Sequence, residues 1–523
     1  AMMGMEMRSS KTNSVGNTVW GYVPERGEIL VSPTRPEDLV PMGMEQEVGW
    51  GALDQLYQGG WKKTSATTNY MSFFATLAYS MKDRYVLNFN VRSDASNRFG
   101  QDVNKQFDPT YSMGFSWRMA EEKFIKDNLP WVNQLNLRGT YGIQGNVVTS
   151  LSPDLIAYYQ GILNGYGQYT LGISSLPNRN LKWERTRTWN LGLDMQLFRA
   201  VTMNVEYYGR RSNAIIRQDI ATEYGFASMP LNGGIIYNHG LEVQMNFTPF
   251  RSKDLVWTVG LNASKNWNKT ETDDRTARAD ELTHSDFLAG NSSRPLKKGY
   301  SLYSFWSYSF AGLNPENGYP MFNYLDTDGP GNASVDPTTF LVYSGESEPY
   351  FTGGFNTRLR WKDFTIGADF ALLLGSKKRL PNPYGTFTNG KMPSPLSNIS
   401  KMLNNRWKKP GDEATTFIPA LYTSIVDLWH VDLPNGLNDT LYNMWGMSDA
   451  MVVSGSFLRC TQLQLSYNLP QSICAKFHAT SLSINASTNN LFVIASGRWN
   501  GYDPELGNST QPRIFSFGLS VGF

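Results

Sequence analysis

The chain has 523 residues, of which 41% are hydrophobic, 13% aromatic and 18% charged, with a formal net charge of +2 at pH 7. No run of about 18 apolar residues is present, which excludes a helical membrane protein. The net charge is close to zero, so no basic surface for nucleic-acid binding is indicated. The two cysteines, Cys460 and Cys474, are too few for a disulfide framework and lack metal-ligand spacing, so both are interpreted as structural.

Apolar and polar side chains alternate with a period of two along most of the chain, which is typical of a barrel wall between lipid and lumen. In the segment 189–197, a slip of one residue would place Asp194 in hydrocarbon. A charge at the bilayer midplane costs up to about 2–4 kcal/mol, so the register is strongly specified. The C-terminal segment shows the pattern best, and we expect five of its side chains to face the membrane: Phe515, Phe517, Leu519, Val521 and Phe523.

This alternation predicts an all-β fold, a transmembrane antiparallel β-barrel with about 16 strands in this chain. In chain order the strands are expected at 1–8, 69–81, 85–96, 108–119, 134–145, 183–198, 201–212, 237–248, 255–267, 299–312, 319–325, 350–361, 364–375, 457–469, 481–495 and 513–523.

The predicted connections differ in length. Short ones are expected at 82–84, 199–200, 315–318 and 362–363, and long ones at 9–68, 146–182, 268–298 and 376–456. Outer-membrane barrels have short periplasmic turns and long extracellular loops, so we assign the short connections to the periplasm. Residues 120–126 predict one or two helical turns within another periplasmic connection.

A soluble all-β protein, such as a jelly roll or a propeller, is the main alternative fold, since its strands also alternate. Its solvent-facing rows carry Lys, Glu and Thr, whereas here one face of strand after strand carries Leu, Phe, Trp, Tyr and Met. The 15 tryptophans and 27 tyrosines also suit two aromatic girdles at the membrane interfaces.

Several phrases of the chain resemble, in the expected order, those of SusC/RagA-type TonB-dependent transporters of Bacteroidetes. They are RSDASNRFG at 92–100, LRGTYGIQGN at 137–146, NLKWERT at 180–186, NHGLE at 238–242, RW at 406–407 with PGD at 410–412, GSFLR at 455–459, LSYNLP at 465–470, NNLF at 489–492 and GYDPE at 501–505. Singly each phrase is weak, but the ordered set is specific.

The resemblance implies a barrel of twenty-two strands with an N-terminal plug and a TonB box. This chain departs from that pattern, because its sequence indicates no plug and only about sixteen strands. Residues 1–7 have no signal-peptide pattern, so we expect residues 1–523 to be the C-terminal part of the barrel, with the plug and N-terminal strands absent from this chain. The rest of the barrel would then belong to another chain or to a longer protein. A self-contained sixteen-stranded porin is the alternative.

The family resemblance also implies a function, which is TonB-dependent import of oligosaccharide or peptide nutrients across the outer membrane of a Gram-negative bacterium. The implied partners are a SusD-like surface lipoprotein acting as a lid, TonB acting through the missing plug, and lipid and lipopolysaccharide around the barrel. No nucleic-acid partner is expected. A passive porin or a surface-binding barrel without TonB coupling is the alternative function.

Loop aromatic residues interleaved with amides are the candidates for substrate binding, because sugars stack on aromatic platforms. The candidates are Tyr158, Tyr159, Tyr166, Tyr169, Trp407, Trp429 and Trp445. Loop packing or an interface with the lid is the alternative for each of them.

Catalysis is not expected, since the four histidines are scattered and no nucleophile elbow, P-loop or dinucleotide fingerprint appears. No cofactor is expected. Asp326 and Asp328 begin like a calcium loop, but the glycine comes early and the terminal Glu of an EF-hand is missing. We interpret the segment as a turn, with a surface calcium site as the alternative.

Overall fold

The computed structural model describes residues 1–16, 22–23, 29–30, 62–97, 107–146, 148, 151, 154–163, 168–178, 180–226, 228–271, 288, 298–323, 341–384, 396, 399–421, 431–433, 437–439 and 441–523. Within these residues, one large sheet of 14 strands dominates, in the order β1-β4-β5-β6-β7-β10-β11-β12-β13-β18-β19-β24-β25-β26. Chain neighbours among these strands are sheet neighbours throughout, and every register described between them is antiparallel.

The strands of the large sheet have from 9 to 24 residues. They are β1 (Met2–Gly16), β4 (Lys62–Met81), β5 (Tyr85–Ser96), β6 (Phe107–Arg118), β7 (Val132–Asn146), β10 (Glu184–Leu197), β11 (Val201–Asp219), β12 (Ser228–Arg251), β13 (Leu255–Thr270), β18 (Phe351–Trp361), β19 (Phe364–Leu374), β24 (Phe457–Asn468), β25 (Ser481–Ala495) and β26 (Ile514–Gly522).

The remaining described strands form two-stranded sheets. Their pairs are β2 (Tyr22–Val23) with β3 (Ile29–Leu30), β8 (Ile156–Leu163) with β9 (Gln168–Ser175), β14 (Ser304–Tyr308) with β17 (Leu341–Glu346), β15 (Phe310–Leu313) with β16 (Pro320–Phe322), β20 (Lys377–Arg379) with β23 (Val452–Ser454), and β21 (Val431–Leu433) with β22 (Leu437–Asp439).

The described helices are all short. The α-helices are α5 (Lys123–Lys126), α8 (Leu441–Gly446) and α9 (Gln471–Cys474), and the 3₁₀ turns are η2 (Met119–Glu121), η3 (Thr222–Tyr224), η5 (Lys401–Asn405), η6 (Asp412–Ala414), η8 (Asp449–Met451), η9 (Ala475–Phe477) and η10 (Gly497–Trp499). Among the described residues, no helix has the length and apolar character needed to cross a membrane. η2 and α5 confirm the helical turns predicted at 120–126.

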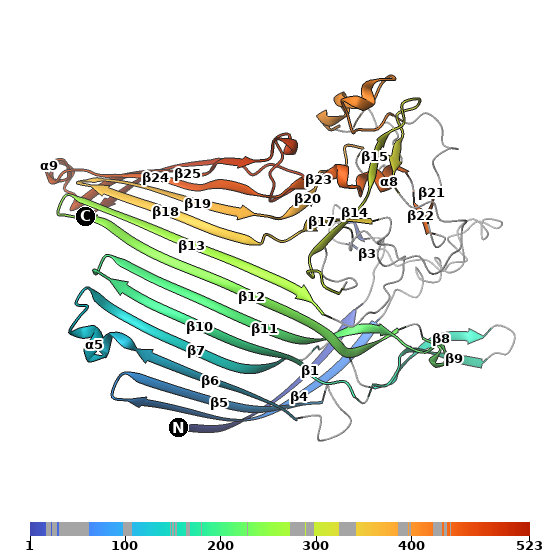
Figure 1. Ribbon diagram of the computed structural model, residues 1–523, viewed down its shortest axis with the longest axis horizontal. Coiled ribbons are helices and arrows are strands. Elements are labelled where there is room, and N and C mark those ends of the chain that lie inside the picture. The colour runs from blue at the N-terminus through green and yellow to red at the C-terminus, as the bar shows by residue number, and fades with distance from the viewer. Residues whose placement is uncertain are drawn as a thin grey trace. The chain divides into compact units, whose positions relative to one another are not determined.

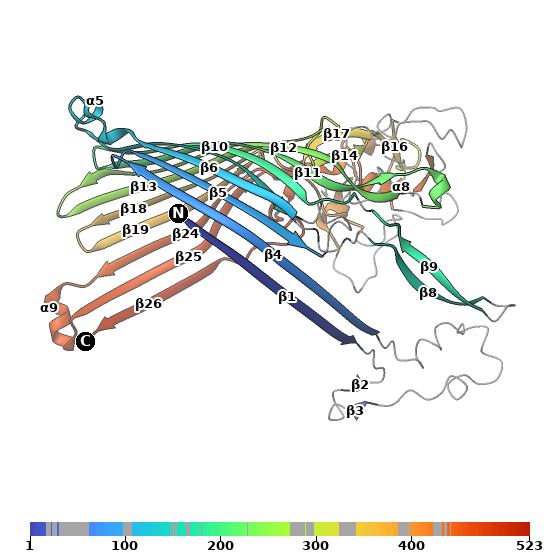
Figure 2. The ribbon, with the colours of Figure 1, turned by 90° about the horizontal axis from the view of Figure 1, so that it is seen from below.

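The chain divides into two compact units. Unit 1 consists of Ala1–Thr76, Asn90–Tyr111 and Val147–Trp183, and unit 2 consists of Leu77–Phe89, Ser112–Asn146 and Glu184–Phe523. Within unit 2, both views of the ribbon place α5 and α9 at one end of the strands and the small β14–β17 sheet at the other end (Figures 1 and 2). The tight connections and the long connections of this unit therefore lie at opposite ends.

Two tight connections have the geometry of hairpin turns. Lys82 and Asp83 have φ values of 52° and 53°, and Phe198 and Arg199 have 53° and 54°. Positive φ at both central residues is characteristic of a type I′ turn, whose twist matches that of the strands it joins. These turns join β4 to β5 and β10 to β11, which are neighbours in the large sheet, and β10 and β11 pair in the register that the alternation requires.

Fourteen of the sixteen predicted strands belong to the large sheet, and the two predicted at 299–312 and 319–325 are corrected. In their place the structure has β14, β15 and β16, which pair in the small sheets. Their alternating apolar residues fill a loop core and do not face lipid, since Trp306 and Tyr308 are only 3% and 2% exposed. The turn predicted at 315–318 therefore joins β15 to β16, and the long connection after β13 extends to β18.

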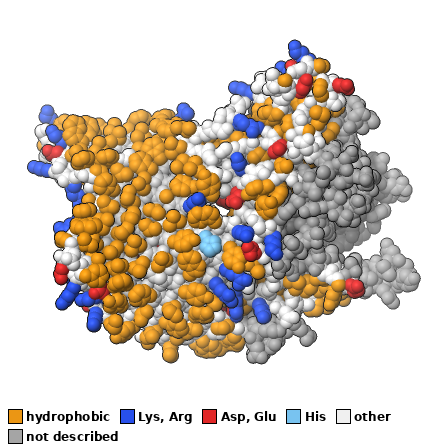
Figure 3. Space-filling model, viewed as in Figure 1, with side chains coloured by type: hydrophobic (Ala, Val, Ile, Leu, Met, Phe, Trp, Pro, Cys, Tyr) orange, Lys and Arg blue, Asp and Glu red, His pale blue; other side chains and the backbone are white. Residues whose placement is uncertain are grey.

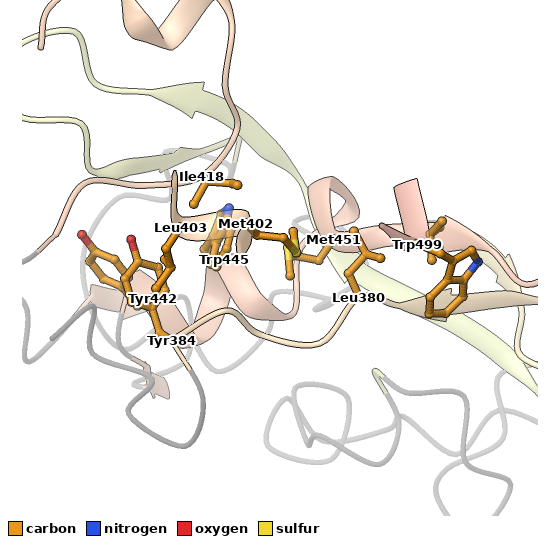
Figure 4. Close-up of a cluster of buried hydrophobic side chains, with 10 residues drawn as sticks. Leu380, Tyr384, Met402, Leu403, Ile418, Tyr442, Trp445, Met451 and Trp499 are labelled. Carbon is orange, nitrogen blue, oxygen red and sulfur yellow. The ribbon is translucent and has the colours of Figure 1, made fainter. Parts of the chain in front are cut away.

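The main packed core of unit 2 lies among the long connections. Leu380, Tyr384, Met402, Leu403, Ile418, Tyr442, Trp445, Met451, Val453 and Trp499 form one buried cluster, which is drawn in Figure 4. Nine of its members come from the connection between β19 and β24, and Trp499 comes from the connection between β25 and β26. This packing gives the connections an interior of their own.

Candidate functional site: the two faces of the sheet

One face of the sheet in unit 2 exposes its apolar side chains. On β26, Phe517 and Phe523 are 83% and 88% exposed, and on β10 Trp189 and Leu191 are also exposed. Figure 3 shows hydrophobic side chains covering this face of the strands. An extended apolar surface of this kind is unfavourable in water and requires lipid. The predicted row Phe515, Phe517, Leu519, Val521 and Phe523 is exposed at every position. The residues between them on β26 are mostly exposed as well, so contact of this row with lipid stays a prediction.

The opposite face of the same strands carries paired charges. Arg138 on β7 binds Asp194 on β10 through two hydrogen bonds, Nε to Oδ2 at 2.8 Å and Nη2 to Oδ1 at 2.9 Å. The same Nη2 reaches Glu206 on β11, with its Oε1 at 2.8 Å. Asn190 and Asn204 donate to Glu206 and Asp194 at 3.1 and 2.5 Å. The network crosses three strands and joins one guanidinium to two carboxylates.

Gly192 is what allows Arg138 to cross β10. The ladder places Gly192 opposite both Arg138 and Glu206. A Cβ atom at position 192 would lie 3.1 Å from Nη2 of Arg138, so a larger side chain would compete for the space that the guanidinium occupies. The alternation Trp189, Leu191 outward and Gly192, Asp194 inward is therefore confirmed, with a specific use for the glycine.

Unit 1 carries a second charged cluster on its strands. Arg92 Nε donates to Asp94 Oδ1 at 2.6 Å, while Nη2 of Arg92 lies 3.2 Å from Oε2 of Glu6 and donates to Ser72 Oγ at 2.8 Å. Ser72 also donates to Asp94. A cavity of about 280 Å³ opens here, lined by Glu6, Arg8, Tyr70, Ser72, Arg92, Asp94 and Trp183. Its mixed charges and two aromatic rings suit polar solutes.

Two phrases of the family resemblance meet at a buried ion pair. Arg459, in GSFLR, donates through Nη2 to both carboxylate oxygens of Asp503, in GYDPE, at 2.8 Å each. Both side chains are only 5% exposed. Glu505 and Gln511 also accept hydrogen bonds from the Arg459 guanidinium, at 3.2 Å each. The pair ties the connection after β25 to the start of β24. Nothing in the spacing of the two phrases indicated this contact.

A similar meeting occurs at Glu184, the glutamate of NLKWERT. Its Oε2 accepts from the Nδ2 of Asn146, the last residue of LRGTYGIQGN, at 2.9 Å. Its Oε1 accepts from the backbone N–H of Ile215 at 2.9 Å. One carboxylate thus links the ends of β7 and β10 to β11.

A buried arginine organises the long connections and was not singled out from the sequence. Arg379 on β20 donates to the carbonyl oxygens of Ser448, Leu288 and Trp306 at 3.1, 2.9 and 2.6 Å. Burial lowers the pKa of its guanidinium to about 9, so it keeps its charge at neutral pH. In the sequence, Arg379 is only one of three consecutive basic residues, Lys377, Lys378 and Arg379. Such a run of basic residues is ordinarily solvated.

Two of the predicted substrate-binding tryptophans are packed inside these connections. Trp445 is fully buried and donates from Nε1 to the carbonyl oxygen of Phe417 at 2.9 Å. Trp407 is buried too, donates to Glu413 at 3.0 Å, and packs so closely on Gly318 that a Cβ there would lie 2.4 Å from its ring. Their positions agree with the loop-packing alternative, and substrate binding by them stays a prediction.

Three of the four predicted tyrosine candidates lie on strands β8 and β9 of unit 1. Tyr158 and Tyr159 lie on β8 and Tyr169 on β9, with Tyr158 opposite Gly172 in the ladder. Their role also stays a prediction. Four other candidates lie outside the described residues: Tyr166, Trp429, and the calcium candidates Asp326 and Asp328.

An aromatic and charged site marks the tight-turn end of unit 2. Glu122, between η2 and α5, accepts hydrogen bonds from Tyr85 Oη at 2.6 Å, Trp117 Nε1 at 3.1 Å and Arg84 Nη1 at 3.0 Å. These bonds, the one from Tyr85 first, hold the pKa of the Glu122 carboxyl below its usual value. Tyr85 continues the outward-facing row of β5 that contains Leu87, and Trp117 continues the outward-facing row of the neighbouring strand β6. Aromatic residues in such positions form the girdle at a membrane interface.

Apolar side chains on one face of long antiparallel strands and ion pairs on the other define a wall of a transmembrane β-barrel, and not a soluble sandwich. The chain belongs to the family described as TonB dependent receptor-like, beta-barrel, whose family model matches residues 46–371. This family lies in the outer membrane of Gram-negative bacteria, as predicted. Its members are receptors and not enzymes, as was also expected.

The relatives agree with the resemblance to SusC/RagA-type transporters. The chain is 28% identical over 511 residues to the TonB-dependent receptor SusC of Bacteroides thetaiotaomicron, covering 92% of this chain and 47% of that protein. It is 25% identical over 478 residues to the TonB-dependent receptor P3 of Formosa agariphila, covering 87% and 44%. The chain spans about half the length of the curated relatives it matches.

Solved structures show the same fold. The structure of the RagAB peptide importer in the closed-closed state matches with a TM-score of 0.70 and 22% identity, covering 100% of this chain and 53% of that chain. The structure of the RagAB peptide transporter matches with a TM-score of 0.66 and 23% identity, covering 90% and 50%. At these identities the likeness concerns the fold alone.

Proposed function

We propose that the protein to which this chain belongs imports oligosaccharide or peptide nutrients across the outer membrane, driven by TonB and together with a SusD-like surface lipoprotein. The observation that carries the proposal is the pairing of a lipid-exposed row with a charged inner row on the same strands, in a chain of the TonB-dependent receptor family. A wall with ion-paired residues on its inner face suits a lumen that contains water or a polar domain.

The relatives and the lining of the unit 1 cavity support both oligosaccharide and peptide as substrate classes. One curated relative is the receptor SusC, and the structural neighbours are the RagAB peptide transporter and the RagAB peptide importer. Neighbouring positive and negative groups, such as Arg8 and Glu6 in the unit 1 cavity, can bind the charged groups of a peptide, and Tyr70 and Trp183 can stack on a sugar. We keep both substrate classes in the proposal.

We infer that residues 1–523 supply the C-terminal part of the barrel, with the plug, the TonB box and further strands outside this stretch of sequence. The chain's share of each relative's length, 47% of SusC and 44% of P3, supports this division. Lipopolysaccharide and lipid would surround the barrel, and the lid would contact the long connections. The partners are part of the proposal.

Deleting the gene and measuring growth on defined carbon sources tests the proposal. We expect the deletion strain to lose growth on one glycan or on a peptide mixture as sole nutrient, and to keep growth on a monosaccharide or on free amino acids that porins admit. Complementation with the intact gene restores growth, and removal of TonB mimics the deletion. Uptake that continues at an unchanged rate without TonB would instead support a passive porin.

A further inference from the structure

A basic cleft lies at the tight-turn end of unit 2. It has a volume of about 710 Å³ and is lined by Lys82, Asp83, Arg84, Arg118, Glu121, Lys123, Lys126 and Asp127. Two connections form its walls, the β4–β5 turn and the helical connection between β6 and β7. The lining contains five cationic side chains and three carboxylates, so the cleft has a net positive charge.

Only some of these cationic side chains are paired within the protein. Arg84 pairs with Glu122 at 3.0 Å, and Lys126 lies 3.6 Å from Glu121. Arg118 donates to the carbonyl oxygen of Asp83 at 3.3 Å. Within the part of the chain that the structure describes, the ammonium groups of Lys82 and Lys123 make no ion pair or hydrogen bond. Two donors of a single cleft therefore remain for an external anion.

The surroundings of the cleft indicate where that anion comes from. Arg84, a lining residue, shares Glu122 with Tyr85 and Trp117, whose rings are stacked with centroids 6.3 Å apart. Leu87 and Phe89 continue the outward row of β5 away from the cleft, and both are exposed. The cleft thus borders the level at which the apolar surface ends, where lipid headgroups lie.

Further aromatic side chains mark the same level. Phe124 on α5 is 55% exposed, next in sequence to Lys123. Trp131, at the end of the same connection, stacks on Phe198 of the β10–β11 turn, with ring centroids 5.0 Å apart, and both rings are exposed. Exposed aromatic rings beside cations are the arrangement that places a surface at the headgroup region of a bilayer.

We propose that this cleft binds the phosphate headgroup of an anionic glycerophospholipid in the periplasmic leaflet of the outer membrane. Short turns of such barrels lie on the periplasmic side, and basic pockets at a membrane interface bind anionic lipid headgroups. Lys82 and Lys123 bind the phosphate oxygens, Lys126 adds positive charge, and Phe124 lies against the acyl chains. Lipid binding at this cleft is separate from nutrient import and does not depend on the substrate.

The test is a lipid titration of the whole outer-membrane protein in detergent, followed by native mass spectrometry. Phosphatidylglycerol is the anionic probe and phosphatidylcholine the zwitterionic one. We expect selective retention of phosphatidylglycerol. The combined substitution Lys82→Gln, Lys123→Gln and Lys126→Gln weakens its binding by about 100-fold, since each cation near an anionic lipid contributes about fivefold.

A matched triple variant provides the control. Lys253→Gln, Lys362→Gln and Lys476→Gln remove the same charge from other connections at the same end, and Lys362 has the same φ of 52° as Lys82. We expect this variant to retain phosphatidylglycerol like the wild type. Equal weakening in both triple variants, or equal retention of the two lipids, would overturn the proposal, because either result means general surface charge without a site.

Two further measurements keep the test decisive. Inorganic phosphate at millimolar concentration should not displace phosphatidylglycerol, and displacement would show a site for a free anion in place of a lipid site. Heat-modifiable migration in gels checks that the variants are folded. If the triple variant fails to fold, Lys123→Gln alone should weaken phosphatidylglycerol binding by about fivefold, and unchanged binding would refute the proposal.

Discussion

The guanidinium of Arg138 lies over Gly192, the residue opposite it on the neighbouring strand β10, and binds Asp194 on that strand and Glu206 on the next strand, β11. A Cβ at position 192 would lie only 3.1 Å from Nη2 of Arg138. The ion pairs of the inner face thus depend on a missing side chain. This relationship connects the alternation visible in the sequence with the network that only the folded sheet assembles.

Replacing Arg138 with Gln should lower the free energy of unfolding by about 1–2 kcal/mol, between the values for exposed and for buried pairs. The reason is that Asp194 and Glu206 would lose their shared cation and repel each other. Urea unfolding in lipid vesicles measures the change. Arg358→Gln is the control, because Arg358 lies on β18 and, within the described chain, makes no ion pair. An equal loss in both variants would contradict the prediction.

Two glycines of paired strands should respond in opposite ways to the same substitution. Gly192→Val displaces the Arg138 guanidinium, and we expect a loss of about 1–3 kcal/mol from overpacking. Gly139→Val places an isopropyl group where no atom lies within 4 Å, opposite Leu191 in the outward row, so stability should stay within about 0.5 kcal/mol or rise. Thermal unfolding of both variants compares them, and similar losses would show that the network does not use the glycine.

A charge on the last strand should act according to the face it enters. Phe517→Lys places an ammonium in the lipid-facing row, and we expect it to cost up to about 2–4 kcal/mol, depending on depth. Ser516→Lys places the same charge on the opposite face, with little expected effect. Folding yield into vesicles measures both. If Ser516→Lys were the more damaging change, the assignment of the two faces would be reversed.

Breaking the buried pair of Arg459 and Asp503 should release the connection between β25 and β26. Asp503→Ala leaves a buried guanidinium with only the weaker Glu505 and Gln511 contacts, and such a loss typically costs about 3–5 kcal/mol. We expect faster proteolysis within 496–513 and a lower melting temperature. The double variant Arg459→Leu with Asp503→Leu should recover part of the loss, because it removes both charges. No recovery would mean that the cost lies in packing alone.

Protonation of Glu122 should destabilise the tight-turn end at acid pH. Its pKa is depressed in the folded protein by hydrogen bonds from Tyr85 and Trp117 and by Arg84, so the stabilisation is present above the unfolded value of about 4.5. It is lost as the pH falls through the lower, folded value. Unfolding measured from pH 7 to pH 3 should show this loss in the wild type and less of it in Glu122→Gln. Glu121→Gln, at the preceding position, should keep the wild-type profile.

Much of the wall could be predicted because its signal is local. Fourteen strands, their lipid-facing rows, the tight turns at Lys82 and Arg199 and the helix near 120–126 all follow from alternation and turn composition. The two misplaced strands show where that signal fails. Trp306 and Tyr308 alternate like lipid-facing residues but are buried in a loop core, and period two alone does not distinguish the two kinds of apolar environment.

The sequence by itself determined that the chain is a barrel wall with one apolar and one charged face, because successive side chains of a strand point to opposite faces of the sheet. Only the tertiary structure decided which charges meet, since Arg138 and Glu206 are 68 residues apart and Arg459 and Asp503 are 44 apart. It also decided that Trp407 and Trp445 fill a core within the long connections. Contacts of that kind depend on how distant segments pack, which no local pattern specifies.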